Sequence, residues 1–252
     1  MGQTVAATRC HIACLQESKL SSLDQHTAAY LGGYHLRNFV FKPATGVLGT
    51  RAGIVILWNE DSIHLTNCAV GKLHLSADIE VKECSTNFWL SVVYEPTRHR
   101  ARQRFLEELK EIKPENNTRW LILGDFNLIY KAADKNNRRL NHRLMWQFRD
   151  ALNECELKEI HLQNRKFTWS NERRDPTLMK LDSFLQCRMG LHVHLSCSSP
   201  SIHLSIRPCP ATTLQSKWPA AAEDIPFRKF LDHTSRIQRG GDEGLDSNLK
   251  SS

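Results

Sequence analysis

At 252 residues, the chain is long enough to bury the core of one large domain, so we expect one domain followed by a tail. Its apolar runs are all much shorter than the ~20 residues needed to span a bilayer, and no charged-then-apolar signal follows Met1, so neither membrane insertion nor secretion is expected. A net charge of +7 favours a polyanionic partner, because neutralised phosphates release counterions. We therefore expect a soluble intracellular protein, nuclear or cytoplasmic, with no inferable protein partner.

Strand-like and helix-like segments alternate through the first two-thirds of the chain. Residues 11–16 and 53–58 are compact apolar runs that predict buried strands. Residues 73–81 alternate apolar and polar residues, as a half-solvated strand does, and residues 88–94 predict its antiparallel neighbour. Residues 120–123 predict the most apolar strand, which leads directly into Gly-Asp-Phe-Asn.

Two amphipathic segments predict helices between and after these strands. Residues 105–112 place their large apolar side chains on one face, and Pro114 ends the segment. Residues 144–152 repeat apolar positions at four-residue spacing. Residues 167–169 and 179–184 predict two more strands around a polar turn.

The composition changes after about Phe184. Residues 187–222 are rich in Ser, His, Pro, Cys and Ala, and we find no steady helix or strand period in them. The eight cysteines have no CxxC spacing and no paired Cys/His groups, which indicates reduced thiols. We predict a domain over residues 1–185 and an irregular segment over residues 186–252.

Polar residues end or interrupt the predicted strands at four places: Glu17, Tyr94, the pair Asp125 and Asn127, and Asp182. Functional side chains gather at strand ends, where a rigid sheet positions loops around a cleft. A carboxylate there is costly unless it holds a metal, a proton or a base partner. Hard oxygen ligands such as Glu17 and Asp125 suit Mg²⁺, so the pattern favours metal-assisted phosphodiester hydrolysis.

Each position also has an ordinary structural interpretation. Glu17 could cap a helix that begins near Ser18, Tyr94 could lie at the edge of the core, and Asp125 with Asn127 could form a simple turn. Taken singly, these interpretations are at least as good as the functional ones.

Taken together, the positions and their flanking residues resemble the endonuclease/exonuclease/phosphatase superfamily. Five blocks occur in the order seen in that superfamily: residues 15–19 (LQESK), 92–97 (VVYEPT), 123–127 (LGDFN), 167–171 (FTWSN) and 181–182 (LD). The match covers nearly all of residues 9–183. Residues 50–54 (TRAGI) and the arginine-rich turn after Trp169 are similar to the endonuclease domain of plant LINE-type (non-LTR) retrotransposons.

The resemblance implies an α/β fold in which a two-sheet β-sandwich is flanked by helices. Glu17 and Asp125 would bind Mg²⁺, and Tyr94 would hydrogen-bond the scissile phosphate of DNA. Asp125 would also orient or deprotonate the attacking water, and Asn127 would help to place it. Asp182 would hold a catalytic histidine in its useful tautomer, and Thr168 would contact the DNA backbone.

The chain departs from the family pattern in three ways. The family's opening strand, with Trp-Asn-x-Arg-Gly, has no counterpart before the Glu17 strand, so we expect an N-terminally truncated fold with an empty central sheet position. Glu95 stands where glycine is usual, which adds a negative charge beside the phosphate site. No Ser-Asp-His motif follows Asp182, so the fold is expected to be incomplete at both ends.

A frameshift near residues 184–188 is our preferred explanation for the missing closing motif. One legitimate set of codons for Ser205 to Leu214, read one base later, encodes Pro-Ser-Asp-His-Ala-Pro-Leu-Leu-Leu. Residues 189–190 and 225–229 permit two further family phrases in the same frame. The alternative is a genuine but divergent C-terminal segment, which we disfavour because it lacks the expected strand pattern.

Three functional hypotheses follow. The leading one is a Mg²⁺-dependent DNA endonuclease domain of retrotransposon origin that is degenerate and inactive as it stands. The second is a basic remnant that binds nucleic acid without cutting it, through Arg138, Arg139, Arg143, Arg173 and Arg174. The third is a mostly unfolded translation product.

Overall fold

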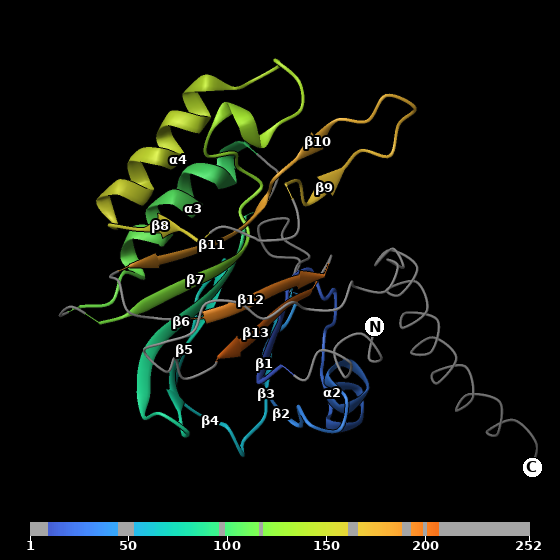
Figure 1. Ribbon diagram of the computed structural model, residues 1–252, viewed down its shortest axis with the longest axis vertical. Helices are drawn as coiled ribbons and strands as arrows, with labels where there is room; N and C mark the ends of the chain where they lie inside the picture. The colour runs from blue at the N-terminus through green and yellow to red at the C-terminus, as the bar shows by residue number, and fades with distance from the viewer. Residues whose placement is uncertain are drawn as a thin grey trace, which may run out of the picture.

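The computed structural model describes residues 10–44, 53–95, 99–115, 118–160, 166–187, 193–198 and 201–206. Two β-sheets pack against each other (Figure 1). Helices α3 (His99–Glu111) and α4 (His142–Glu154) cover the outer face of one sheet, and α2 (Gln25–Gly32) packs on the other. The expected α/β sandwich flanked by helices is confirmed. Within these ranges, no helix is both long and apolar enough to cross a membrane.

The first sheet is antiparallel throughout. Its strand order is β12 (Val193–Ser198), β13 (Ser201–Ile206), β1 (Ile12–Leu15), β3 (Ile54–Trp58) and β2 (Asn38–Lys42). Leu15 lies opposite Val55 of β3, and Phe41 of β2 lies opposite Val55 on its other side. The end of β1 that leads to Glu17 therefore lies at the same edge of the sheet as the end of β2.

The second sheet contains one parallel pair in an otherwise antiparallel arrangement. Its order is β4 (Ile63–Val70), β5 (His74–Val81), β6 (Thr86–Tyr94), β7 (Trp120–Asp125), β11 (Asp182–Cys187) and β8 (Lys158–Glu159). Strands β6 and β7 are parallel and are connected through α3, because a parallel pair needs a crossover. A small hairpin of β9 (Trp169–Ser170) and β10 (Leu178–Met179) lies outside both sheets.

The main core lies between the two sheets. Ile12, Cys14, Ile54 and Ile56 of the first sheet pack in one cluster with apolar residues of β5, β6 and β7 of the second. These residues alternate along each strand, so all of them point into the space between the sheets. A slip of one residue would turn the whole set toward the outer face. The sheets therefore keep a fixed register at the end where Glu17 and Tyr94 lie.

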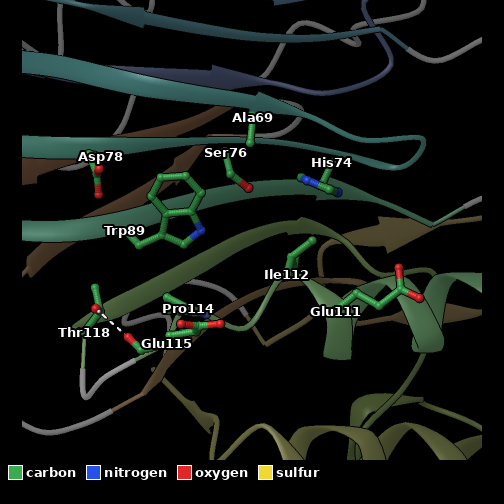
Figure 2. A pocket seen from close by; sticks show the side chains of 10 residues that line it. All are labelled: Ala69, His74, Ser76, Asp78, Trp89, Glu111, Ile112, Pro114, Glu115 and Thr118. Carbon is green, nitrogen blue, oxygen red and sulfur yellow. Dashed lines mark hydrogen bonds between the residues drawn. The ribbon is translucent and has the colours of Figure 1, made fainter.

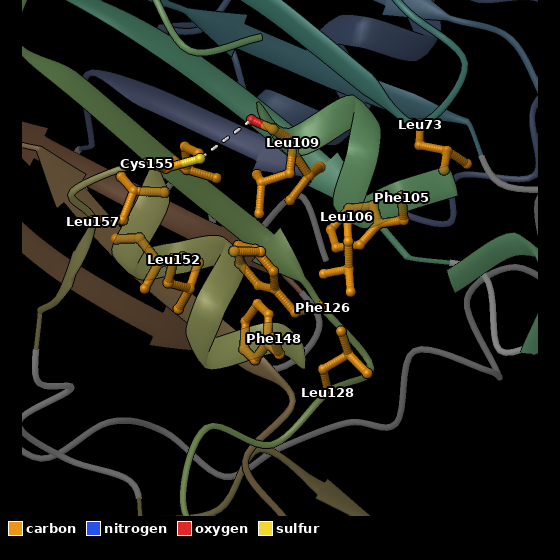
Figure 3. Close-up of a cluster of buried hydrophobic side chains, with 14 of the residues drawn as sticks. Leu73, Phe105, Leu106, Leu109, Phe126, Leu128, Phe148, Leu152, Cys155 and Leu157 are labelled. Carbon is orange, nitrogen blue, oxygen red and sulfur yellow. Dashed lines mark hydrogen bonds between the residues drawn. The ribbon is translucent and has the colours of Figure 1, made fainter. Parts of the chain in front are cut away.

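A second core fixes the loop that follows β7 (Figure 3). Phe126 is fully buried between the helices: its ring centroid lies 5.9 Å from that of Phe105 of α3 and 5.4 Å from that of Phe148 of α4. Burial of one such side chain contributes roughly 1.5–3 kcal/mol. Since Phe126 stands between Asp125 and Asn127, this packing anchors both polar residues.

The expectation of an irregular segment beyond residue 185 is wrong for residues 193–198 and 201–206. Strands β12 and β13 form an antiparallel hairpin, and β13 pairs with β1, so that Ile12 lies opposite Leu204. The sequence does alternate here, with Val193, Leu195 and Cys197 separated by polar residues. The many Ser and His residues obscured that period, and residues 207–252 lie outside the described ranges.

The expectation of an empty position beside β1 is also wrong. Strand β1 is paired on both sides, by β3 and by β13. The strand that carries Glu17 to the site is therefore an interior strand with both backbone edges hydrogen-bonded.

Candidate active site

Glu17 and Tyr94 meet across the two sheets. Glu17 follows β1 of the first sheet, Tyr94 ends β6 of the second, and the Tyr94 hydroxyl donates to Glu17 Oε1 at 2.5 Å. Both side chains are partly buried. Burial, and then the hydrogen bond to Glu17, raise the pKa of Tyr94 well above its ordinary value. The phenol therefore stays protonated and can act as a hydrogen-bond donor.

Asp125 lies beside both Tyr94 and Asp182 in the second sheet. It is opposite Tyr94 in the parallel β6–β7 pair and opposite Asp182 in the antiparallel β7–β11 pair. Asn127 binds the same carboxylate: its backbone N donates to Oδ1 at 2.8 Å and its Nδ2 to Oδ2 at 3.1 Å. The structure thus brings Glu17, Tyr94, Asp125, Asn127 and Asp182 together at one end of the sandwich; their chemical roles stay predictions.

Two residues of this group adopt a backbone conformation that L-residues seldom use. Glu17 has φ 53° and Asn127 has φ 47°, both in the left-handed region. Asparagine tolerates this region, but for glutamate it costs on the order of 1 kcal/mol or more. Strain of this kind persists where the surrounding structure holds a side chain in a required direction, which supports a functional site.

Negative charge is crowded around Asp125. Burial and then the charge of Asp182 raise its pKa above the ordinary value, even though the hydrogen bonds from Asn127 act to lower it, and Glu17 adds to the rise. A divalent cation would relieve this repulsion. In the described part of the chain, no three His, Cys, Asp or Glu side chains surround one point. Glu17 and Asp125 nevertheless fit Mg²⁺, which is commonly held by one or two carboxylates, waters and substrate phosphate.

Thr168 supports Asp182. Its Oγ1 accepts hydrogen bonds from the backbone N of Leu181 at 2.9 Å and of Asp182 at 3.1 Å. Thr168 therefore has a structural role, since this hydroxyl fixes the first residue of β11. Its contact with DNA stays a prediction.

Glu95 is wholly buried directly after Tyr94. Its carboxylate forms an ion pair with Arg102 of α3, with Oε1 3.1 Å from Nε, although the angles fall outside hydrogen-bond geometry. Burial raises the pKa of Glu95 to about 8, although the Arg102 guanidinium acts to lower it. Its backbone oxygen accepts from Asn127 Nδ2 at 2.7 Å, so Glu95 also positions a member of the site. Sequence reasoning did not single out Arg102 and missed this pairing.

Four of the five arginines proposed to bind nucleic acid lie on two loops that are tied together, and the fifth, Arg143, lies in the first turn of α4. Arg138, Arg139 and Arg143 are exposed around the start of α4, and Arg173 and Arg174 are exposed in the β9–β10 turn. Asn136 links the loops, since its Nδ2 donates to Pro176 O at 2.8 Å and its Oδ1 accepts from Leu178 N at 3.0 Å. The four loop arginines therefore belong to neighbouring loops.

A cavity of about 410 Å³ lies away from this group, on the outer face of the second sheet beside the end of α3 (Figure 2). His74, Trp89, Ile112 and Glu115 are among its lining residues, and none of the five converging residues lines it. The cavity thus does not belong to the candidate active site.

The sequence profile of the endonuclease/exonuclease/phosphatase family matches residues 2–194. The chain belongs to this family. Its members include phosphodiesterases, nucleases and phosphatases, and they generally depend on a divalent metal. Family membership thus agrees with the oxygen-rich site at the end of the sandwich.

Solved structures share the fold of this family member at low sequence identity. The endonuclease domain of TRAS1, a telomere-specific non-LTR retrotransposon, aligns with a TM-score of 0.54 and 15% identity, covering 81% of this chain and 89% of that chain. The human Nocturnin catalytic domain with bound sulfate aligns with a TM-score of 0.52 and 15% identity, covering 81% and 83%. No curated protein matches the sequence.

Proposed function

We propose that this chain is a Mg²⁺-dependent DNA endonuclease domain of LINE-type retrotransposon origin. The observation that carries the proposal is the convergence of Glu17 from one sheet with Tyr94, Asp125 and Asp182 from the other. The fold shared with a retrotransposon endonuclease domain supports it. The exposed arginines beside the hairpin favour DNA as the substrate, because they would neutralise backbone phosphates.

In this proposal, Glu17 and Asp125 would hold Mg²⁺, and the bound ion would supply Lewis-acid polarisation of the scissile phosphate. The Tyr94 hydroxyl, which donates to Glu17 in the absence of metal and DNA, would turn its one proton to a phosphate oxygen once Glu17 binds the ion, as its high pKa allows. Asp125 orients the attacking water and accepts its proton, and Asn127 holds the Asp125 carboxylate in place through two hydrogen bonds.

We further propose that the chain binds metal and DNA without measurable nicking. The sequence after Asp182 contains no Ser-Asp-His, and a general acid or transition-state partner is typically worth ~10²–10⁴ in rate. Loss of one member of a catalytic set removes most of the benefit of the others.

A plasmid-nicking assay with and without Mg²⁺ tests both statements, together with a gel shift in EDTA. We expect salt-dependent DNA binding, Mg²⁺ binding that Asp125→Ala weakens, and no nicking. Nicking that Asp125→Ala abolishes would show that the chain is an active enzyme. Absence of both DNA and metal binding would overturn the nuclease proposal itself.

The alternative, a non-catalytic nucleic-acid-binding protein, is favoured by the linked arginine loops. It predicts DNA binding that is insensitive to Asp125→Ala and to Mg²⁺, but weakened when Arg138 and Arg173 are replaced by Gln.

A further inference from the structure

Gln16 carries a buried amide directly before Glu17. The residue is only 5% exposed, and its Nε2 atom has no hydrogen-bond partner among the described residues. A buried N–H donor without an acceptor costs free energy, so such donors are uncommon in folded proteins and call for a specific explanation. The Gln16 amide is therefore available to donate to a ligand.

The Gln16 side chain faces the second sheet. Ile12 and Cys14 of β1 pack in the core between the sheets, while the other two residues of β1 pack under α2. Contact with the neighbouring segment continues past Gln16, since Ser18 N donates to Gly53 O at 3.1 Å. Because side chains alternate along an extended chain, Gln16 shares the face of Ile12 and Cys14.

Tyr94 faces the same space from the second sheet. It packs against the core between the sheets, as Phe88 and Val92 do at alternate positions of β6. Its hydroxyl meets the Glu17 carboxylate at the end of that core. Gln16 and Tyr94 thus point into the space between the sheets from opposite sides, at the end where Glu17 bridges them.

A phosphodiester has the chemistry that the Gln16 amide needs. Its non-bridging oxygens share a negative charge, and a hydrogen bond to a charged oxygen is stronger than one to a neutral oxygen. The carboxylates crowded around Asp125 repel phosphate unless a cation neutralises them. An ion held by Glu17 and Asp125 would therefore bring phosphate to the end of the sandwich that Gln16 faces.

Resting on the nuclease function proposed above, we infer that the Gln16 amide donates a hydrogen bond to a non-bridging oxygen of the scissile phosphate, from the side opposite Tyr94. The two donors come from different sheets, so the phosphate is held between them. Because the amide is buried before DNA arrives, it needs little reorganisation to make this contact.

The test is the gain in DNA affinity that Mg²⁺ gives the full chain. A fluorescent duplex is titrated in EDTA and in Mg²⁺ at matched ionic strength, so that the exposed arginines contribute alike. Mg²⁺ should strengthen binding by the unaltered chain. Gln16→Met keeps a long unbranched side chain but has no donor, so it should lower the affinity in Mg²⁺ about tenfold and leave the affinity in EDTA unchanged.

Gln186→Met is the matched control. The Oε1 atom of Gln186 is likewise buried without a partner in the part of the chain that the structure describes. Gln186 lies near the other end of β11, opposite Leu121, whereas Asp182 lies opposite Asp125. This variant should leave the affinity unchanged both in EDTA and in Mg²⁺.

Thermal unfolding with and without Mg²⁺, in the absence of DNA, separates phosphate binding from an effect through Glu17. Gln16→Met should gain as much stability from Mg²⁺ as the unaltered chain does. If that gain is smaller, Gln16 positions the metal ligand Glu17 and the inference is wrong. If both Gln16→Met and Gln16→Leu unfold the protein, Gln16 is structural and the inference is wrong.

The same titrations distinguish failure of this inference from failure of the proposed function. Full Mg²⁺-dependent affinity in folded Gln16→Met overturns the role of Gln16 and leaves the nuclease proposal intact. If Mg²⁺ does not strengthen DNA binding by the unaltered chain, the nuclease proposal fails, and this inference fails with it.

Discussion

Gly124 allows β7 to lie close against β6 immediately before Asp125. Its φ is 153°, and a Cβ atom there would lie 1.9 Å from the backbone oxygen of Val93. The obstacle is backbone of the neighbouring strand, which cannot swing aside. We predict that Gly124→Ala lowers the free energy of unfolding by about 2 kcal/mol or more, as measured by urea denaturation. An unchanged urea midpoint would contradict this close approach.

We expect the Asp125 carboxylate to lower the stability of the metal-free fold and to serve as a metal ligand. Because burial, Asp182 and Glu17 all disfavour its charged form, we predict that Asp125→Asn raises the stability in EDTA by roughly 1 kcal/mol. Unaltered protein should gain about 1.4 kcal/mol at a Mg²⁺ concentration ten times Kd, and the variant should gain almost nothing. Thermal unfolding with and without Mg²⁺ measures both effects, and equal Mg²⁺ stabilisation of the two proteins would rule out Asp125 as a ligand.

Glu108 should make stability depend on pH in the acid range. Burial acts to raise its pKa, but the hydrogen bonds from His74 and from Leu73 N outweigh it, so the folded pKa lies below the ordinary value. The contribution is then complete above the unfolded pKa of about 4.3 and is lost as the pH falls through the folded value. Unfolding free energies of the unaltered chain and Glu108→Gln should therefore converge below about pH 4.3. If the difference between the two unfolding free energies grew on acidification, the assigned direction of the Glu108 pKa shift would be wrong.

At the scale of elements, the buried Glu95–Arg102 pair joins the start of α3 to the end of β6. Removing one partner of a buried pair typically costs about 3–5 kcal/mol, because the other charge stays buried. The cost should be smaller here, since Glu95 readily takes up a proton. We predict that Arg102→Met destabilises by roughly 1–3 kcal/mol and that Glu95→Gly in the same chain restores most of the loss. Additive effects in this double-mutant cycle would show that the two side chains are uncoupled.

The hairpin of β12 and β13 gives a second prediction about an element. Strand β13 lies between β12 and β1, so the backbone N–H of Leu204 faces a neighbouring strand on either side. Proline has no N–H, so Leu204→Pro removes a hydrogen bond of the sheet. Leu204→Pro should lower the melting temperature by several degrees, whereas Leu204→Thr, which keeps the backbone donor, should do so much less. If Leu204→Pro melted at the same temperature as the unaltered chain, the original expectation of an irregular segment would be restored.

The elements that sequence reasoning predicted are those with a strong apolar period, such as β5, β7 and α4. It missed α2, which is short and begins at the N-cap Asp24, whose side chain accepts from Thr27 N. It also missed β4, where most residues are exposed and no apolar run marks the strand. Elements of this kind are stabilised by capping and by pairing with a neighbour, and neither leaves a strong periodic signal.

At the scale of the whole molecule, the site joins residues that are up to 165 positions apart between Glu17 and Asp182. Sequence reasoning found these residues because each of them follows or ends an apolar strand. It could not find the burial of Glu95, because that burial depends on how the end of β6 meets helix α3. The frameshift stays a prediction, and the DNA sequence across codons 184–214 decides it.

Strand β7 lies between its parallel partner β6 and its antiparallel partner β11, and these partners are made at very different times during translation. β6 precedes β7 on the ribosome, whereas β11 is synthesised about sixty residues later, or roughly 3–12 s at ordinary elongation rates. During that interval, the most apolar strand of the sheet has one unpaired edge, which is a template for intermolecular pairing. Nascent chains stalled between α4 and β11 should therefore aggregate or recruit chaperones more strongly than chains released after β11.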